Sequence, residues 1–141
     1  MDIRIREMTM ADFESAVALW KKTEGIGLSQ ADSRENIERF LSRNPGLSFV
    51  ALDNGSLVGA VMSGHDGRRG FLYHLAVAPE HRRRGTGGLL VDACLKELVK
   101  QGMRKCHIFV MTDNEPGKRF WRSTGWQERF DITAMSHDLG A

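Results

Sequence analysis

Hydrophobic and polar residues recur with two different periods in the N-terminal part of the chain. Apolar and polar residues alternate over Asp2–Glu7, which predicts a first strand. A capping-box pattern over Thr9–Asp12, followed by apolar residues at helical spacing, predicts a helix. The segment Thr23–Gln30 breaks that pattern with two glycines and predicts a loop. A second helix, capped by Asp32 or Ser33, follows the loop.

Three strands are predicted in the middle of the chain. Leu47–Asp53 and Ser56–His65 are joined by Asn54-Gly55, a dipeptide that strongly favours a tight hairpin turn. The next strand, Phe71–Val77, is almost wholly apolar. Such a run is typical of a central strand that is covered on both faces of its sheet.

Two helices and further strands are predicted in the second half. Leu90–Leu98 carries a helical stripe of apolar residues, and Cys106–Met111 predicts the next strand. Asn114 is a helix cap, and Trp126–His137 predicts one or two final strands. Strands and helices thus alternate without an internal repeat. We therefore expect a single α/β domain with a mixed sheet over residues 1–141.

The composition is that of an ordinary globular protein and argues against several classes of function. Of the 141 residues, 41% are hydrophobic and 27% are charged, and a formal net charge of +2 does not by itself indicate nucleic-acid binding. No apolar run approaches the ~20 residues of a membrane span and no signal-peptide pattern is present, so we expect a cytoplasmic protein without a membrane partner. The two cysteines, Cys94 and Cys106, and the five histidines lack the spacing of metal ligands, so we expect no metal.

One stretch, Glu80–Leu90 (EHRRRGTGGLL), concentrates three arginines and three glycines between a predicted strand and a predicted helix. Its charge is compatible with a solvated loop, a nucleic-acid patch or a phosphate site. Glycines let the backbone approach an anion closely, and the following helix presents its N-terminal amides. Arginines donate forked hydrogen bonds to phosphate oxygens. This combination favours a phosphate or a pyrophosphate ligand.

Two common phosphate loops do not match this stretch. The P-loop requires GxxxxGK[ST], and the dinucleotide fingerprint GxGxxG lacks its third glycine here. The pattern Arg-x-x-Gly-x-Gly over Arg82–Gly87, preceded by Leu75–Glu80, instead resembles the GNAT superfamily of acyl-CoA-dependent N-acetyltransferases. Asn114 and the segment Phe120–Trp126 (FWRSTGW) extend the resemblance toward the C-terminus.

The resemblance implies a fold, a reaction and a donor site. The implied fold is α/β, with a mixed, mostly antiparallel central sheet whose strands splay apart, flanked by about four helices. The implied reaction transfers an acetyl group from acetyl-CoA to an amine of a small molecule or a protein, by direct attack on the thioester. The implied donor contacts are backbone pairing with the pantetheine arm, amides on the pyrophosphate, arginines on the 3′-phosphate, and side chains near the thiol and along the pantetheine. The residues implied to pair with the pantetheine arm are Leu75, Ala76 and Val77, and those whose amides hold the pyrophosphate are Arg83, Arg84, Gly85, Thr86, Gly87 and Gly88. The arginines implied for the 3′-phosphate are Arg82, Arg83 and Arg84. Asn114 is implied near the thiol, and Phe120 along the pantetheine.

Amine attack requires a base, because an alkylamine with a lysine-like pKa of about 10.4 is mostly protonated at neutral pH. His74 is the first candidate, because it adjoins the implied cofactor strand and because histidine ordinarily titrates near neutrality. A hydrogen-bonded core histidine is the competing interpretation. Glu24 and Asp32, which flank the N-terminal loop, are further candidates. A backbone N–H near Ala76 or Val77 is the expected donor to the developing oxyanion.

The chain departs from the family at Trp121, where many members carry a tyrosine that protonates the departing thiolate. An indole donates a hydrogen bond but is not a usable acid. Tyr73, the only tyrosine of the chain, is an alternative acid. Because an ordinary thiol has a pKa of about 8.5, its thiolate leaves with little help, and we expect water or no acid in this role.

The acceptor amine is expected against the loop Glu24–Leu28 and the residues that follow it. Glu24 and Asp32 would attract a cationic amine, and Arg34 would bind an acceptor carboxylate. For Asp32, helix capping is the competing role. The resemblance is also compatible with a homodimer in which Asp131–His137 takes part.

Two rival classes of function stay open at this point. The first is a CoA-binding module of the same fold that has lost catalysis, which the tryptophan at position 121 and the lack of an obvious carboxylate base make plausible. The second is a nucleic-acid binder, for which the aromatic residues interleaved with basic ones are missing. We therefore expect an acyl-CoA donor, an amine acceptor and no nucleic acid. The acceptor itself, the length of the acyl group and the oligomeric state are not determined by the sequence.

Overall fold

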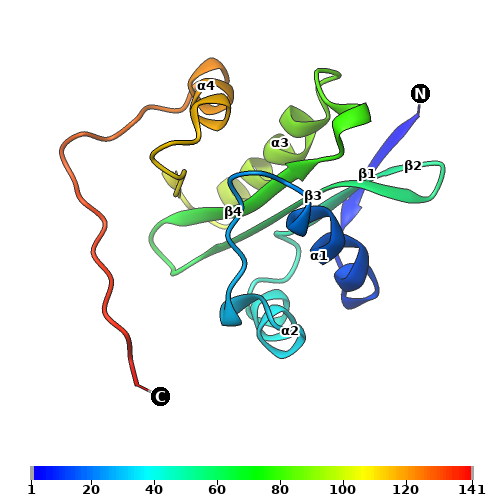
Figure 1. The fold of residues 1–141 in the computed structure, drawn as a ribbon. Coiled ribbons are helices and arrows are strands. Elements are labelled where there is room, and N and C mark those ends of the chain that lie inside the picture. Colours follow the sequence, from blue (N-terminus) through cyan, green and yellow to red (C-terminus); the bar gives the residue numbers. More distant parts are fainter. Residues whose placement is uncertain (1, 141) are drawn as a thin grey trace. The chain divides into compact units, whose positions relative to one another are not determined.

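The computed structural model describes residues 2–140, which divide into two compact units with a boundary between Phe109 and Val110. The strands and α-helices of the first unit, in chain order, are β1 (Ile3–Glu7), α1 (Phe13–Lys21), α2 (Arg34–Arg43), β2 (Phe49–Asp53), β3 (Ser56–His65), β4 (Gly70–Val77), α3 (Thr86–Lys100) and β5 (Cys106–Ile108). Short 3-10 turns, η1 (Met10–Asp12), η2 (Gln30–Asp32) and η3 (Pro79–His81), precede α1, α2 and α3. The second unit contains α4 (Glu115–Ser123) (Figure 1).

Local sequence signals account for most of these boundaries. The side chain of Thr9 and that of Asp12 cap each other's backbone at η1, as the capping-box pattern predicts. The Ser33 hydroxyl accepts a hydrogen bond from Asn36 N at 3.2 Å, so Ser33 rather than Asp32 caps α2. Asn54 and Gly55 both have positive φ, at 50° and 82°, which is the geometry of the tight hairpin turn between β2 and β3.

The five strands form one sheet in the order β1-β2-β3-β4-β5. Every neighbouring pair is antiparallel except β4 and β5, which run parallel. The β4–β5 pairing extends only over Gly70–Leu72, so the second half of β4 has no strand partner on that edge among residues 2–140. The predicted α/β fold, with a mixed, mostly antiparallel sheet and splayed strands, is confirmed.

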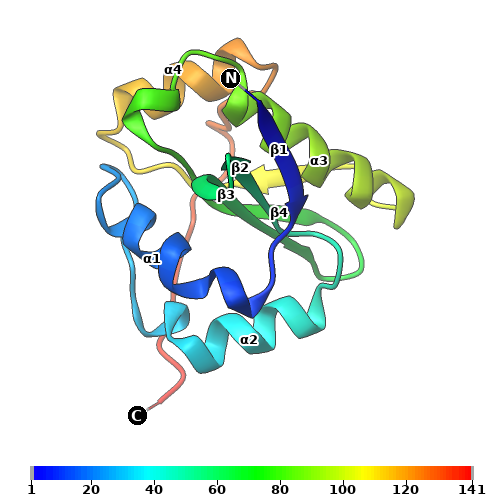
Figure 2. The ribbon, with the colours of Figure 1, turned by 90° about the vertical axis from the view of Figure 1, so that its right-hand side faces the viewer.

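Helices cover both faces of the sheet within the first unit. Helices α1 and α2 lie on one face and α3 lies on the other, as the two ribbon views agree (Figures 1 and 2). The main core cluster fills the α1/α2 face and includes Trp20, Ile37 and Ala76. On the α3 face, Leu90 and Leu98 pack so closely on Gly59 and Gly70 that a Cβ on either glycine would lie 2.9 Å from a leucine methyl carbon.

A β-bulge interrupts β4 at its centre. Met62 of β3 pairs with Tyr73, whereas Ala60 pairs with Ala76, so β4 contains one more residue than β3 across this interval. The backbone of His74 takes up the irregularity with φ of 57°, which is rare for a residue with a side chain. The bulge changes the alternation along the strand, which brings Tyr73 and Ala76 onto the same face.

The C-terminal part of the chain differs from the predicted elements in two places. Helix α4 begins where predicted, because the Asn114 side chain accepts a hydrogen bond from Gly117 N at 3.0 Å. The strands predicted over Trp126–His137 are wrong, since no residue from 125 to 140 lies in a helix or strand. The strand predicted over Cys106–Met111 is also shorter and ends at Ile108. Alternating residues form a strand only when a neighbouring strand takes up their backbone hydrogen bonds, and the alternation alone does not supply that neighbour.

No helix between residues 2 and 140 is both long enough and apolar enough to cross a membrane.

Candidate functional site

The glycine-rich loop runs from the end of β4 into the N-terminus of α3. The first backbone hydrogen bond of α3 is donated by Leu89 N to Gly85 O at 3.0 Å. The amides of the first helical turn, Thr86 to Gly88, therefore lack intrahelical acceptors and carry the positive end of the helix dipole. An anion at this helix end would accept their hydrogen bonds, which fits the predicted pyrophosphate site.

Two glycines of the loop serve different purposes. Gly85, the N-cap of α3, has φ of 81°, a left-handed conformation that a residue with a side chain resists. Gly88 does not have positive φ, and a Cβ placed on it would meet no atom within 4 Å. The fold therefore does not require glycine at position 88. Open space above a helix N-terminus is what a phosphate group needs in order to reach the amides.

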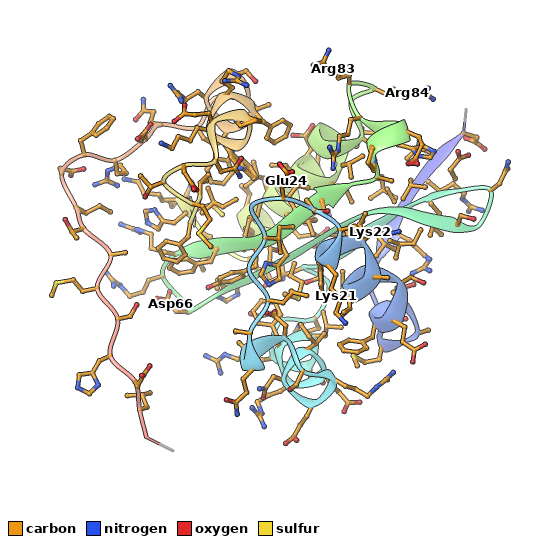
Figure 3. All side chains as sticks on the ribbon, viewed as in Figure 1. Lys21, Lys22, Glu24, Asp66, Arg83 and Arg84 are labelled. Atoms are coloured by element: carbon orange, nitrogen blue, oxygen red, sulfur yellow. The ribbon has the colours of Figure 1, made fainter. Side chains whose placement is uncertain are left out.

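The three arginines of the loop also differ in their contacts. Arg82 turns back onto β4, where its Nε donates to Val77 O at 2.9 Å. Arg83 has φ of 62° and an exposed side chain, and Arg84 is exposed as well. Figure 3 shows the side chains of Arg83 and Arg84 extending from the tip of the loop. This placement adds positive charge where the predicted outer phosphate of CoA would lie.

A histidine and an aspartate tie the start of the loop to the sheet. His81 Nε2 lies 2.9 Å from Asp53 Oδ2 at the end of β2. The other ring nitrogen, Nδ1, is buried and has no hydrogen-bond partner within residues 2–140. The Ala78 amide donates to Val58 O at 2.8 Å beside this pair. These contacts hold η3 against the β2–β3 hairpin and so restrict the loop from its N-terminal side.

The half of β4 that carries Leu75, Ala76 and Val77 presents an open edge next to this loop. Its pairing with β5 ends at Leu72, so the edge beyond has no neighbouring strand in the described part of the chain. The carbonyl of Val77 is the exception, because it already accepts from Arg82. An open strand edge can pair with an extended chain of amides, as the predicted contact with the pantetheine arm requires.

The bulge brings His74 and Asp32 together although 42 residues separate them in the sequence. His74 Nε2 lies 2.8 Å from Asp32 Oδ1, and both side chains are mostly buried. The second carboxylate oxygen of Asp32 accepts from Ser29 N at 3.0 Å, which fixes the orientation of the carboxylate. Trp20 packs on the other side, with its ring centre 5.2 Å from that of His74. Asp32 thus caps η2 rather than α2, and it contacts the candidate base, a role that the sequence did not suggest.

The remaining ring nitrogen of His74 is the one available for chemistry. Within residues 2–140, Nδ1 of His74 makes no hydrogen bond, and it is not among the buried side-chain atoms that lack a partner. It is therefore in contact with solvent. If Nε2–H donates to Asp32, the imidazole carries its lone pair at Nδ1. A neutral histidine held in this way can accept a proton.

Tyr73 lies beside His74 but in a different environment. Its ring meets Phe40 of α2 edge-on, with the ring centres 5.9 Å apart, and stacks on Phe71 at 6.5 Å. Burial, with a smaller contribution from Cys106, raises the pKa of Tyr73 above its usual value. The phenol therefore stays protonated at neutral pH, but it gives up its proton less readily than an exposed tyrosine.

The N-terminal loop crosses next to β4, and its predicted acceptor residues separate into two groups. Ile26 and Leu28 pack on the core cluster and so anchor the loop beside Asp32. Glu24 is exposed on the loop (Figure 3). Arg34 is placed elsewhere: its guanidinium lies 4.8 Å from the ring centre of Phe13 and pairs with a carboxylate of α1 at 3.4 Å. The structure therefore brings Asp32, but not Arg34, to His74.

The predicted donor residues of the second unit lie on α4. Asn114 caps the helix through its side-chain oxygen, so this oxygen already has a hydrogen-bond partner. Phe120 meets Trp121 edge-on, with ring centres 5.0 Å apart. Trp121 is buried and also contacts Trp126 at 4.9 Å. The residue at the position of the family's tyrosine thus packs among aromatic rings, consistent with a structural role.

Sequence reasoning missed two participants. Trp20 is one of the apolar residues at helical spacing that follow Thr9–Asp12, yet it packs on His74, and its indole nitrogen is buried without a partner among the described residues. The contact between His81 and Asp53 has no local signal either, because each residue meets the other only through the folded sheet. Within residues 2–140, no cluster of histidine, cysteine, aspartate and glutamate could hold a metal ion.

Comparisons with known proteins agree with this geometry. The chain matches the acetyltransferase (GNAT) family over residues 5–126. An acetyltransferase of Pectobacterium atrosepticum is 39% identical over 115 residues, which cover 82% of this chain and 79% of that protein. An acetyltransferase of Yersinia enterocolitica is 37% identical over 113 residues, covering 80% and 79% of the two chains.

Solved structures show the same fold. The structure of Ard1 from Thermoplasma volcanium superposes with a TM-score of 0.80 at 26% identity and covers 95% of this chain and 86% of its own. The PaiA N-acetyltransferase of Thermoplasma acidophilum, in complex with coenzyme A, has a TM-score of 0.77 at 22% identity and covers 90% and 91%. The sequence match, the shared fold and the amide-lined helix end lead to one conclusion. The chain belongs to the acetyltransferase (GNAT) family and is an acetyl-CoA-dependent N-acetyltransferase.

Proposed function

We propose that His74 is the general base of this N-acetyltransferase and that Asp32 holds it in place. The observation that carries the proposal is the 2.8 Å contact between His74 Nε2 and Asp32 Oδ1 at the bulge of β4. A carboxylate on one ring nitrogen orients the imidazole and stabilises the imidazolium that forms when the other nitrogen takes a proton. The solvent-facing Nδ1 is then the atom that receives the proton of the acceptor ammonium, directly or through one water.

The donor is held by the residues that the family resemblance named. Bound acetyl-CoA supplies an activated acetyl thioester, which an unprotonated amine attacks directly. The amides of Arg83 to Gly88 hold the pyrophosphate, and the edge Leu75–Val77 pairs with the pantetheine arm. The resemblance implies that Asn114 contacts the cofactor near its thiol end and that Phe120 packs along the pantetheine. A backbone N–H near Ala76 or Val77 donates to the oxygen on which negative charge develops.

The proton for the departing thiolate comes from water in this proposal. Tyr73 is the second candidate acid, although its raised pKa makes it a weaker acid than a solvated tyrosine. Because a CoA thiolate leaves with little help, the loss of this acid would lower kcat only slightly. Changing Tyr73 to Phe tests the role, since the variant would lower kcat at neutral pH, where the phenol is protonated, only if Tyr73 is the acid.

Thiol release from acetyl-CoA, measured over pH 5.5–9.5 with a panel of primary amines, tests the base. A base must be unprotonated, so kcat/KM rises with pH and levels off. His74→Gln is expected to lower kcat/KM by the ~10²–10⁴ typical of lost acid–base catalysis and to remove the His74-dependent limb. Asp32→Asn should lower kcat with a smaller change in the KM for acetyl-CoA. His137→Gln, which changes an exposed histidine near the C-terminus, is the matched control.

Two results would contradict the assignment. An unchanged pH profile in the His74 variant would show that another group or water removes the proton. Tight CoA binding by the wild-type protein, without turnover of any amine, would instead favour the CoA-binding module that the sequence left open.

We further propose the extent of the domain, the approach of the acceptor and the location of the enzyme in the cell. We propose one N-acetyltransferase domain over residues 1–141, because the family match spans both compact units. The acceptor is an amine that approaches past Glu24 and Asp32, and the arginine-rich loop serves CoA rather than a nucleic acid. We place the enzyme in the cytoplasm, where acetyl-CoA is available and where two unpaired cysteines stay reduced.

A homodimer through the C-terminal segment completes the proposal. Phe130, Ile132, Met135 and Leu139 are 57% to 99% exposed in this segment. Monomeric proteins rarely expose several large apolar side chains in one short segment, and a second copy would cover them. Light scattering coupled to gel filtration, on the full chain and on a variant with Ile132 and Met135 changed to serine, tests the dimer. A monomeric mass for the full chain would overturn it.

A further inference from the structure

Five cationic side chains gather at the end of β4 that lies opposite to the phosphate loop. Arg43 ends α2, Arg68 and Arg69 lie in the turn between β3 and β4, and Arg104 and Lys105 immediately precede β5. We call these five residues the basic end. Figure 3 shows the two ends of the strand, with Asp66 in the turn at one end and Arg83 and Arg84 at the other.

Backbone contacts bring the three segments of the basic end together. Gly70 N, next to Arg69, donates to Lys105 O at 2.9 Å, and Gly70 is paired with Cys106 in the sheet. At the end of α2, Asn44 Oδ1 accepts from His65 N at 3.1 Å, which fastens the segment after Arg43 to the last residue of β3. The cations are therefore neighbours because of the fold, although they come from distant parts of the sequence.

The charge of the basic end is not neutralised within residues 2–140. None of its five side chains makes an ion pair with a described residue. Asp66 is the carboxylate within the turn. The amides of Arg69 and Arg68 donate to it at 2.9 and 2.8 Å and hold its pKa below the usual range. One carboxylate in the turn against five cations leaves a net positive charge on these three segments, which an acidic partner would complement.

An aromatic strip connects the basic end with His74. Phe71 and Tyr73 lie on the α2 face of β4, where Tyr73 meets Phe40 edge-on and stacks on Phe71. A pocket of about 240 Å³ is lined by these three rings and by Arg43 of the basic end. Its other lining residues are Asn44, Gly64, His65 and Asp66. Phe71 further stacks on Phe109, which is 67% exposed, with ring centres 6.3 Å apart. An acceptor molecule that extends from His74 along this face therefore passes over aromatic rings and reaches the arginines of the basic end.

We propose that the acceptor is a polypeptide amine that carries acidic side chains about four to six residues away from the reacting nitrogen. This inference rests on the proposed function, because it places the amine at His74. Five steps along β4 separate Arg69 from His74, a distance of about 16 Å at ~3.3 Å per residue. An extended peptide covers that distance in about five residues. Its acidic side chains pair with the basic end, while its intervening residues lie on Phe71, Tyr73 and Phe40.

The test uses the full-length enzyme and twelve-residue peptides with a single free amine. In one arm the amine is the N-terminus of a peptide without lysine, and in the other it is a single lysine of an N-acetylated peptide. Each peptide is made with three glutamates at distances of four to six residues from the amine and with three glutamines at the same places. Thiol release gives kcat/KM, and fluorescence anisotropy of labelled peptides gives Kd without any need for turnover.

In at least one arm, the glutamate peptide is expected to have about tenfold higher kcat/KM and tighter binding than the glutamine peptide. The factor corresponds to two or three exposed ion pairs. It should shrink between 0.05 and 0.5 M salt, because solvent-exposed pairs are screened. The double variant R68Q/R69Q should lower the glutamate-to-glutamine ratio toward one. The matched variant R4Q/K21Q removes the same charge from exposed positions on β1 and α1 and should leave that ratio as in the wild type.

Several outcomes would overturn the inference and leave the proposed function standing. These are equal kcat/KM for both peptides, a ratio that survives in R68Q/R69Q, or acetylation of small amines without binding of the glutamate peptides. Equal affinity for a DNA oligonucleotide of matched charge would also overturn it, because the basic end would then be a general polyanion site. If the glutamate peptides bind through Arg68 and Arg69 but no amine is acetylated, the basic end binds acidic peptides, and both the proposed function and the assignment of the peptide as acceptor fail.

Discussion

Changing Gly88 to Ala separates the folding role of the phosphate loop from its binding role. Gly88 lies in the first turn of α3, and a Cβ added there would meet no protein atom within 4 Å. Alanine is the better helix former by about 0.5–1 kcal/mol, so the variant is expected to be as stable as the wild type or slightly more stable. A methyl group at this place would nevertheless stand between the helix amides and a phosphate.

The expected loss is one charge-assisted hydrogen bond between a backbone amide and the pyrophosphate. Such bonds contribute about 1.5–3 kcal/mol, which corresponds to a KM for acetyl-CoA that is roughly 10- to 150-fold higher. The value of kcat at saturating acetyl-CoA should change little, because the reacting groups lie at the other end of the cofactor. Calorimetric titration with CoA checks the affinity, and thermal unfolding checks the stability.

Changing Gly85 to Ala is the contrasting variant. Its φ of 81° forces an alanine into the left-handed region, at about 1–2 kcal/mol, so this variant should unfold at a lower temperature. Gly85→Ala is therefore expected to lower the stability, whereas Gly88→Ala is expected to keep it or raise it slightly. A Gly88 variant that binds CoA as tightly as the wild type would refute the reasoning, because the phosphates would then not lie on this helix end.

Further predictions concern the loop anchor, the core and the thiols. Asp53→Asn weakens the contact with His81 and should raise the KM for acetyl-CoA several-fold with kcat unchanged; a drop in kcat alone would contradict the anchoring role. Asp12→Asn should destabilise the fold by about 2 kcal/mol, because the charged, two-point pairing with Arg6 is lost at a buried position. Since Arg6 holds the pKa of Asp12 below its usual value, this contribution is present above pH ~4 and is lost as the pH falls further, which urea unfolding at several pH values would show. Burial raises the pKa of both cysteine thiols to about 12, so iodoacetamide at pH 8 should label the native protein far more slowly than the unfolded chain.

The phosphate loop could be located from the sequence because its features are local. Gly85, Gly88 and the arginines occupy one short stretch between a strand and a helix, and a helix N-terminus provides its amides wherever it lies in a fold. The capping residues Thr9 and Ser33 are local in the same sense, and both cap where the sequence placed a helix start.

The contact between His74 and Asp32 joins distant segments of the chain, and the tertiary structure alone supplied it. The sequence named His74 and Asp32 as separate candidates, but their contact requires the β4 bulge and a loop anchored on the core. The predicted strands after Trp126 failed for the same physical reason, since alternation describes one strand and says nothing about its neighbour. The sequence by itself determined the helices, the hairpin and the phosphate loop, where hydrogen bonds close within a few residues. Only the folded chain decided which side chains meet across the sheet, because burial and pairing there depend on residues far apart in the sequence.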